Sequence, residues 1–266
     1  MVKILFSATP VIGRTTMRDC QFEATVLCQV QDVRSWELGA VPEQRIAQQR
    51  SHGNDSPSEF CTMGNSATTA MANSGPVTAA MIRGIQLQRM TVPAITTETA
   101  TTGGCFPAGD LWKDQPAVIF VVRRPGCMLC REHALDLSEN HAKFAAKGVK
   151  LVGVVHEKLG VEEFSTFFKN GEIYFDEEKS FFNALGMRWE GLSSMMKPSV
   201  FKNGKRASDR GVKGNFKGEG RLLGGLLVVG AGDSGVDFEH REKVFGDHAS
   251  MEDILKSVNS VSKMTD

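Results

Sequence analysis

From Leu111 to the C-terminus, short apolar runs rich in Val and Ile alternate with amphipathic segments of helical period. The first run, AVIFVV at residues 117–122, is continuous, as expected of a strand that is buried on both faces of a sheet. An amphipathic stretch at residues 127–147 follows it, and Gly148 is the expected C-terminal cap. This alternation predicts an α/β fold, in which a central mixed β-sheet is flanked by helices.

The rest of this region continues the pattern and ends in a hairpin and a helix. The residues around AGDSG predict a hairpin, and SMEDILKSVNSV predicts a final helix with Ser250 as N-cap and Asp253 in its first turn. Between them and the earlier elements, the basic stretch KNGKRASDRGVKGNFKGEGR predicts a mobile, solvated connection, and GNFKGEG within it a turn. Further strands are expected at KLVGVVH and GEIYFDE, and further helices at VEEFSTFF and EKSFFNALG.

The first third of the chain lacks this periodicity. Residues 1–108 show no sustained period of 2 or 3.6 and contain polar and Thr-rich stretches, so a long disordered N-terminal region is expected before a domain at residues 109–262. Deletion of residues 1–105 is then expected to leave folding and redox activity nearly intact. The basic, hydroxyl-rich start suggests a plastid or mitochondrial transit peptide, but Asp19 and Glu23 soon afterwards favour a cytoplasmic protein.

Charge and composition exclude several classes of partner. Thirty-one basic residues balance thirty-one acidic ones, so no overall field attracts nucleic acid. The apolar runs are far shorter than the roughly 20 residues of a membrane-spanning helix. Six cysteines in 266 residues are too few for a disulfide scaffold and favour a reducing compartment.

The stretch VVRRPGCMLCRE carries the chemistry that the sequence predicts. Cys127 lies where a central strand passes into a helix, and unpaired N–H groups, the helix dipole and the charges of Arg123 and Arg124 would all favour its thiolate. Cys130, one helical turn later and more buried, could resolve an oxidised Cys127 as a disulfide. We therefore expect a redox pair with Cys127 as nucleophile, supported by Arg123, Arg124, Pro125 and Gly126.

Two alternatives to a redox pair are a zinc site and a pair of inert buried thiols. His133 and His141 complete a formal Cys2His2 set, but on one helix Cys130 and His141 would lie about 16 Å apart, too far to share one ion. No metal is expected. His141 is predicted to pack in the core and His133 to face solvent. In the last strand, alternation places Glu239 and Arg241 together on one face of a solvated edge.

Four collinear segments, RRPGCMLCRE, GEIYFDEEKSFFNALG, GNFKGEGRLLGGLLVVG and EHREKVFGD, resemble the peroxiredoxin-like 2 family between about Leu111 and Val258. The resemblance implies a thioredoxin-like fold of the AhpC/TSA antioxidant group, with Cys127 and Cys130 as the redox centre. LVGVVHEKLGVEEF is similar to the prostamide/prostaglandin F synthase branch and EHREKVFGD to the antioxidant branch, so the branch stays open.

The sequence departs from related families at two places. Arg124 stands three residues before Cys127, where peroxiredoxins carry a hydroxyl residue, which puts fast peroxide reduction in doubt. Gly224 and Gly225 stand where thioredoxins carry a cis-proline, and they either leave room for a substrate or allow a tight entry to a strand.

The expected function is that of a thiol oxidoreductase which reduces hydrogen peroxide, an organic hydroperoxide or a lipid endoperoxide. Its reducing equivalents would come from NADPH through a thioredoxin-type partner, with no cofactor bound to this chain. The alternatives are a protein disulfide reductase, and a redox sensor or interaction module without catalysis.

Overall fold

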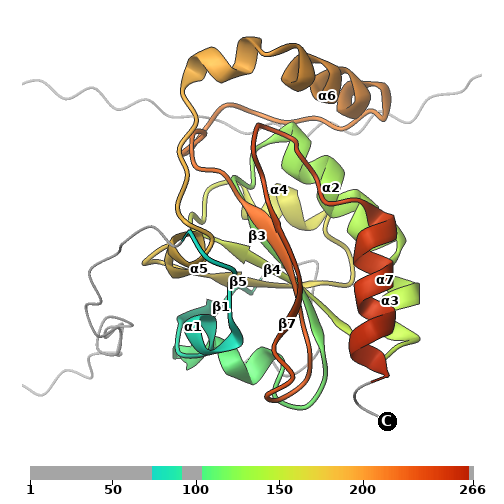
Figure 1. Cartoon of the computed structure of the whole chain (residues 1–266). Helices are drawn as coiled ribbons and strands as arrows, with labels where there is room; N and C mark the ends of the chain where they lie inside the picture. Colours follow the sequence, from blue (N-terminus) through green and yellow to red (C-terminus); the bar gives the residue numbers. More distant parts are fainter. Residues whose placement is uncertain (1–73, 92–103, 264–266) are drawn as a thin grey trace, which may run out of the picture. The chain divides into compact units, whose positions relative to one another are not determined.

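The computed structural model describes residues 74–91 and 104–263, and these residues build a mixed β-sheet with helices on both faces (Figure 1). The strand order is β2-β1-β5-β4-β3-β6-β7. Strands β3, β4 and β5 are mutually parallel, whereas β6 pairs antiparallel with β3, and β7 antiparallel with β6. The strands are β1 (Gln86–Arg89), β2 (Phe106–Pro107), β3 (Ala117–Val122), β4 (Lys150–Val155), β5 (Glu172–Phe175), β6 (Gly225–Val229) and β7 (Val236–Arg241).

Strand β3 lies at the centre of the sheet because all six of its residues are apolar and buried. Phe120 and its alternate neighbours contact one hydrophobic core, and Ile119 and Val121 contact a second core on the other face. The prediction of a strand buried on both faces is therefore confirmed.

The two faces of the sheet are covered by different helices. Helices α2, α3, α4 and α7 contribute to the core on one face, and α1, η1 and α5 to the core on the other. Helix α6 packs on α2 and lies at the end of the domain, as Figure 1 shows. The helices are α1 (Ala79–Arg83), η1 (Ala108–Leu111), α2 (Met128–Glu139), α3 (His141–Ala145), α4 (Val161–Ser165), α5 (Ser180–Ala184), η2 (Leu192–Met196), α6 (Pro198–Asp209) and α7 (Met251–Ser262).

This connectivity is that of the thioredoxin-like fold. A parallel β3-α2-β4 unit is joined in one sheet to the antiparallel β6-β7 hairpin, and α7 follows the hairpin. The predicted cap of α7 is confirmed, because the Ser250 hydroxyl accepts a hydrogen bond from the Asp253 N–H. None of the helices in the described ranges is long and apolar enough to cross a membrane.

The predicted helix at residues 127–147 is divided into two. Helix α2 ends at Glu139, and α3 begins at His141. The interruption is at Asn140, whose backbone leaves the helical conformation (φ −96°, ψ 0°) and whose side-chain amide donates to the Asp136 carbonyl. Gly148 has a φ of +66°, which agrees with its predicted role after the helix.

The basic stretch before β6 is not the mobile connection that its composition predicts. Its residues 202–209 form the later part of α6, which starts earlier, with Pro198 at a position where the missing N–H costs no hydrogen bond. Arg206 of α6 makes two hydrogen bonds to the fully buried carboxylate of Glu132 on α2. This bidentate ion pair fixes α6 to the domain. The second half, including GNFKGEG, is an irregular loop.

Part of the predicted disordered region, residues 1–108, is ordered. Residues 74–91 form α1 and β1, which pairs with β5, and Ile82 and Leu87 are fully buried. Residues 104–108 are ordered as well, with β2 among them. These elements are too short to show a period in the sequence. The remaining part of the predicted region, residues 1–73 and 92–103, lies outside the described residues.

Strand β7 is an edge strand, but its charged residues are not solvated as predicted. Glu239 and Arg241 share one face and form an ion pair, which confirms the alternation. Both side chains are mostly buried, because Glu239 accepts a hydrogen bond from the Val77 N–H and Arg241 donates one to the Gly75 carbonyl. The segment before α1 therefore covers this edge of the sheet.

Candidate active site

Cys127 occupies the predicted position between β3 and α2. Its backbone is extended at the N-cap of α2, and its N–H donates to the Arg124 carbonyl to close the Pro125-Gly126 turn. The side chain lines a cleft, whereas Cys130 is 1% exposed and lies one turn further into the hydrophobic core. A ligand in the cleft would therefore meet Cys127 before Cys130.

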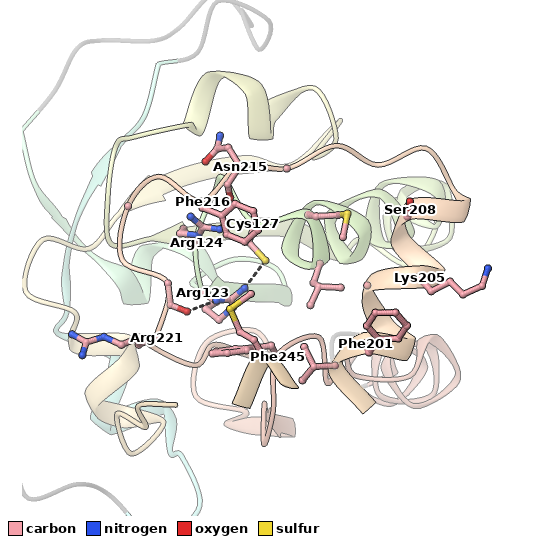
Figure 2. A pocket seen from close by; sticks show the side chains of 18 of the residues that line it. Arg123, Arg124, Cys127, Phe201, Lys205, Ser208, Asn215, Phe216, Arg221 and Phe245 are labelled. Carbon is pink, nitrogen blue, oxygen red and sulfur yellow. Dashed lines mark hydrogen bonds between the residues drawn. The ribbon is translucent and has the colours of Figure 1, made fainter. Parts of the chain in front are cut away.

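Arg123 is the arginine that contacts the Cys127 sulfur. Its Nη2 donates to Cys127 Sγ at 2.5 Å, its Nη1 donates to the Gly220 carbonyl, and its guanidinium lies 4.5 Å from the centre of the Phe245 ring. Figure 2 shows this arrangement, with Arg123 between Cys127 and Phe245. The side chain is buried, so its charge is poorly screened by water. His156 holds the Arg123 backbone carbonyl at 2.9 Å through Nε2.

The two thiols have opposite pKa shifts. Hydrogen bonds from Cys130 and the charge of Arg123 lower the pKa of Cys127 well below its ordinary value, although burial opposes this shift. The negative charge and hydrogen bonding of Cys127, together with burial, raise the pKa of Cys130 well above its ordinary value. These shifts favour the negative charge on Cys127 and the proton on Cys130.

Glu242 is a buried carboxylate beside this group, and no sequence pattern predicted its position. Its Oε2 accepts a hydrogen bond from the Gly224 N–H at 2.9 Å. Burial raises the Glu242 pKa to about 7, although the charge of Arg123 opposes the shift. Gly224 itself leaves no space for a substrate, because a Cβ there would lie 2.2 Å from the Val121 carbonyl oxygen. It therefore allows a tight entry to the strand.

Arg124 donates its hydrogen bonds to a loop and not to the Cys127 sulfur, although its charge also contributes to the lowered Cys127 pKa, less than that of Arg123 does. Its guanidinium donates to the carbonyl oxygens of Asn215 and Lys217, and Arg131 of α2 donates to those of Pro125 and Lys213. The loop at residues 213–220 is thus held over the start of α2.

Two glycines permit this close approach of the loop to α2. A Cβ on Gly214 would lie 2.4 Å from the Met128 nitrogen, and one on Gly126 would lie 2.3 Å from Asn215 Oδ1. Gly126 therefore serves loop packing, and Pro125 supplies a carbonyl to Arg131. We find no contact of either residue with the Cys127 sulfur among the described interactions.

The cleft that Cys127 lines has a volume of about 980 Å³. Apolar side chains from α2, α6, the loop and the segment after β7 form most of its wall, including Met128, Leu129, Val200, Phe201, Phe216 and Phe245. Arg123 and Cys127 lie at its base, and Lys205 and Arg221 at its sides (Figure 2). Its size and apolar lining suit an organic molecule better than one as small as hydrogen peroxide.

The two histidines of the considered zinc set have the reverse of their predicted positions. His133 is buried and stacks on His248 with ring centres 4.4 Å apart, whereas His141 is partly exposed at the start of α3. Burial and the nearby His240 and Arg206 lower the pKa of His133 to about 3, so that it is neutral at physiological pH. Across residues 74–91 and 104–263, no three potential metal ligands converge.

Two kinds of comparison with known proteins relate the chain to AhpC/TSA and peroxiredoxin-like proteins. The family model described as AhpC/TSA antioxidant enzyme matches residues 136–244, a span that begins after the cysteine pair. Peroxiredoxin-like 2A of Xenopus tropicalis is 42% identical over 160 residues, covering 59% of this chain and 70% of that protein. Peroxiredoxin-like 2A of Rattus norvegicus is 44% identical over 162 residues, covering 60% and 70%.

Among solved structures, peroxidoxin BcpB from Mycobacterium tuberculosis aligns with a TM-score of 0.44 and 14% identity. The alignment covers 66% of this chain and 92% of that chain.

Proposed function

The chain belongs to the peroxiredoxin-like 2 family, and from this premise we propose that it is a thiol-dependent oxidoreductase that reduces a peroxide bond through Cys127 and Cys130. The observation that carries the proposal is the contact of the buried Arg123 with Cys127 Sγ at the base of an open, apolar cleft. A thiolate stabilised in this way, and lining a cleft although only 4% exposed, is suited to nucleophilic attack.

The reaction needs two steps: the first transfers two electrons from Cys127 to the peroxide, and the second forms the disulfide within the pair. The Cys127 thiolate attacks one oxygen of a hydroperoxide, the O–O bond breaks, and the other oxygen leaves with a proton as an alcohol or water. Cys127 is then a sulfenic acid. The Cys130 sulfur attacks Cys127 Sγ, an S–S bond forms, and the sulfenic oxygen leaves as water with the Cys130 proton. Two electrons have passed from the thiols to the peroxide.

An endoperoxide would follow the same path. Attack on one ring oxygen would leave that oxygen bonded to Cys127 Sγ and release the other as an alkoxide, which takes a proton. Cys130 would then displace the first oxygen as a second hydroxyl. The apolar cleft wall supports an organic hydroperoxide or a lipid endoperoxide in preference to hydrogen peroxide. The absence of a hydroxyl residue at Arg124 is consistent with this preference.

The oxidised pair must be reduced before a second turnover. A thioredoxin-type protein, itself recharged from NADPH, would attack the Cys127–Cys130 disulfide and return two electrons and two protons. Cys127 is the sulfur that a partner can reach, because it lines the cleft and Cys130 does not. No cofactor bound to this chain takes part in the proposed cycle.

The test is steady-state turnover with NADPH, thioredoxin reductase and thioredoxin, using hydrogen peroxide, cumene hydroperoxide and an endoperoxide in turn. Cys127→Ser is expected to abolish turnover with every substrate. Cys130→Ser is expected to consume one equivalent of peroxide and stop at a sulfenic acid on Cys127, which a dimedone-type probe and peptide mass spectrometry would locate.

Four results would contradict the proposal. The first two are a sulfenic acid trapped on Cys130 in the wild type and peroxide turnover that persists in Cys127→Ser. The third is reduction of insulin disulfides without reduction of any peroxide, which would identify a protein disulfide reductase. The fourth is stoichiometric oxidation of the pair without turnover, which would identify a sensor.

A further inference from the structure

The segment from Met195 to Arg221, which we call the rim segment, concentrates exposed apolar side chains. Phe216, Met196 and Phe201 are 85%, 86% and 77% exposed, and Met195 is 44% exposed. Only three other large apolar side chains are comparably exposed in the described ranges, namely Met81, Leu159 and Trp189. Trp189 precedes the rim segment and lies against Arg221. Exposed apolar groups gathered in this way mark an interaction surface.

The rim segment is also basic, although the chain as a whole is neutral. Residues 197–221 contain eight Lys or Arg residues and two acidic residues. Arg206 and Arg210 are engaged by carboxylates of α2, including Glu132 and Asp136, and they hold α6 in place. The exposed lysines at 202, 213 and 217 make no ion pair in the described structure, and they supply a positive surface beside the aromatic rings.

Side chains of both kinds line the Cys127 cleft: Phe201 and Phe216 are aromatic, and Lys205 and Arg221, which pair with Asp209 and Glu219, are basic. Phe201 and Lys205 lie one turn apart on α6, and Phe216 projects from the loop on the other side. Figure 2 shows Phe201 and Lys205 on one side of Cys127, with Phe216 and Arg221 on others. The apolar tips therefore stand around an opening, and they do not pack on one another as a closed core would.

We propose that the rim segment docks the protein on anionic phospholipid membranes, with Phe201, Phe216 and Met196 entering the boundary between headgroups and acyl chains. The neighbouring lysines would face lipid phosphates. Aromatic and apolar side chains among Lys and Arg residues are the combination that binds this boundary, and the attraction falls as salt is added. Docking in this orientation would place the cleft mouth against the membrane.

Charge favours a membrane over a second copy of the chain. Two copies docked by the same segment would bring two basic surfaces together, which is unfavourable. The separate projections from η2, α6 and the loop also surround a hollow, whereas a protein interface needs a continuous packed centre. An anionic bilayer satisfies the charge and accepts separate apolar insertions.

The experiment is sedimentation of the full chain with vesicles of phosphatidylcholine, alone or mixed with phosphatidylserine. Binding is expected only to the mixed vesicles and should weaken as sodium chloride is raised. Two sets of variants of the full chain, unchanged outside the substituted residues, locate the surface. Lys202→Glu, Lys213→Glu and Lys217→Glu are combined, and so are Met196→Ser and Phe201→Ser. Each set is expected to reduce the bound fraction at least about tenfold, since each removes several contacts.

Matched controls lie outside the rim segment, on both faces of the sheet. Lys143→Glu, Lys147→Glu and Lys256→Glu reverse three exposed charges on or near α3 and α7, and Met81→Ser removes an exposed methionine on α1. These variants should bind like the wild type. Thermal melting and circular dichroism exclude unfolding in every variant.

Three outcomes would overturn the proposal. One is no binding to the mixed vesicles, and another is an equal loss of binding in the control and rim variants. The third is a salt-insensitive dimer that the rim variants dissociate, which would make the segment a self-association surface. The vesicle measurement uses no peroxide, so its result is independent of whether the redox proposal stands.

Discussion

Replacement of Arg123 by methionine tests which charge activates Cys127. Methionine keeps much of the length and apolar contact of the side chain against Phe245 but removes the cation that touches Cys127 Sγ. Because that cation stabilises the thiolate and not the thiol, its loss should raise the pKa of Cys127. The hydrogen bonds from Cys130 and the start of α2 remain and should limit the change.

The magnitude follows from the contact and from its burial. A unit charge about 4 Å from another contributes roughly 4 kcal/mol at the effective dielectric of a protein site, which corresponds to about 3 pKa units. Relaxation of the site lowers this figure, so a rise of about 1 to 3 units in the Cys127 pKa is expected. At a pH below both values, each unit lowers the thiolate fraction tenfold, and the greater nucleophilicity of the more basic thiolate recovers about threefold. A rise of 2 units should therefore slow alkylation about tenfold.

The assay is the pH dependence of iodoacetamide alkylation at Cys127, read by peptide mass spectrometry because the chain has other cysteines. Arg123→Lys keeps the charge and should restore most of the low pKa. Arg124→Met is the comparison variant, since Arg124 donates to the Asn215 and Lys217 carbonyls and acts on the sulfur only through its charge, so a smaller rise in the Cys127 pKa is expected. An unchanged profile in Arg123→Met, or a larger shift in Arg124→Met, would refute this account of thiolate activation.

Three further predictions concern stability. The pKa of Glu242 is raised in the folded protein to about 7 from an ordinary 4.5, so the folded state binds the extra proton between these values and wild-type stability should fall as pH rises through this window. In urea denaturation at pH 5 and pH 8, Glu242→Gln should remove roughly 3 kcal/mol of that fall. An equal pH dependence of stability in both proteins would contradict the pKa shift. Gly214→Ala should destabilise the folded protein by roughly 1 to 3 kcal/mol because its Cβ would meet the Met128 backbone. Gly84→Ala, whose Cβ would have no atom within 4 Å, should leave the melting temperature nearly unchanged. A larger loss of stability in Gly84→Ala than in Gly214→Ala would refute the packing argument. Leu87→Ala in β1 should cost about 2 to 5 kcal/mol, against about 1 kcal/mol or less for the exposed Arg89→Ala, and equal small effects would mean that residues 74–91 are not part of the fold.

The last of these predictions replaces the sequence-based expectation for deletion of residues 1–105. That deletion would remove α1 and β1 together with the buried Ile82 and Leu87. A marked loss of stability is therefore expected, measured as a lower melting temperature of the truncated chain.

Local patterns in the sequence determine the central elements of this protein. The continuous apolar run of β3 leaves it no exposed face, so it must lie inside a sheet. The Ser250 cap determines where α7 begins, because the hydroxyl binds an N–H within the same turn. The position of Cys127 at the start of α2 follows from the same short-range signals. These interactions join residues only a few positions apart.

The tertiary structure alone decided which of two adjacent arginines contacts Cys127. Neighbouring side chains at the end of a strand point to opposite sides, and the sequence does not say which side holds the sulfur. Arg123 is held there by the Gly220 carbonyl and by Phe245, 97 and 122 positions further along the chain. The same applies to His133, whose burial depends on stacking with the distant His248. Such contacts arise only when separate elements pack, so local sequence periodicity does not predict them.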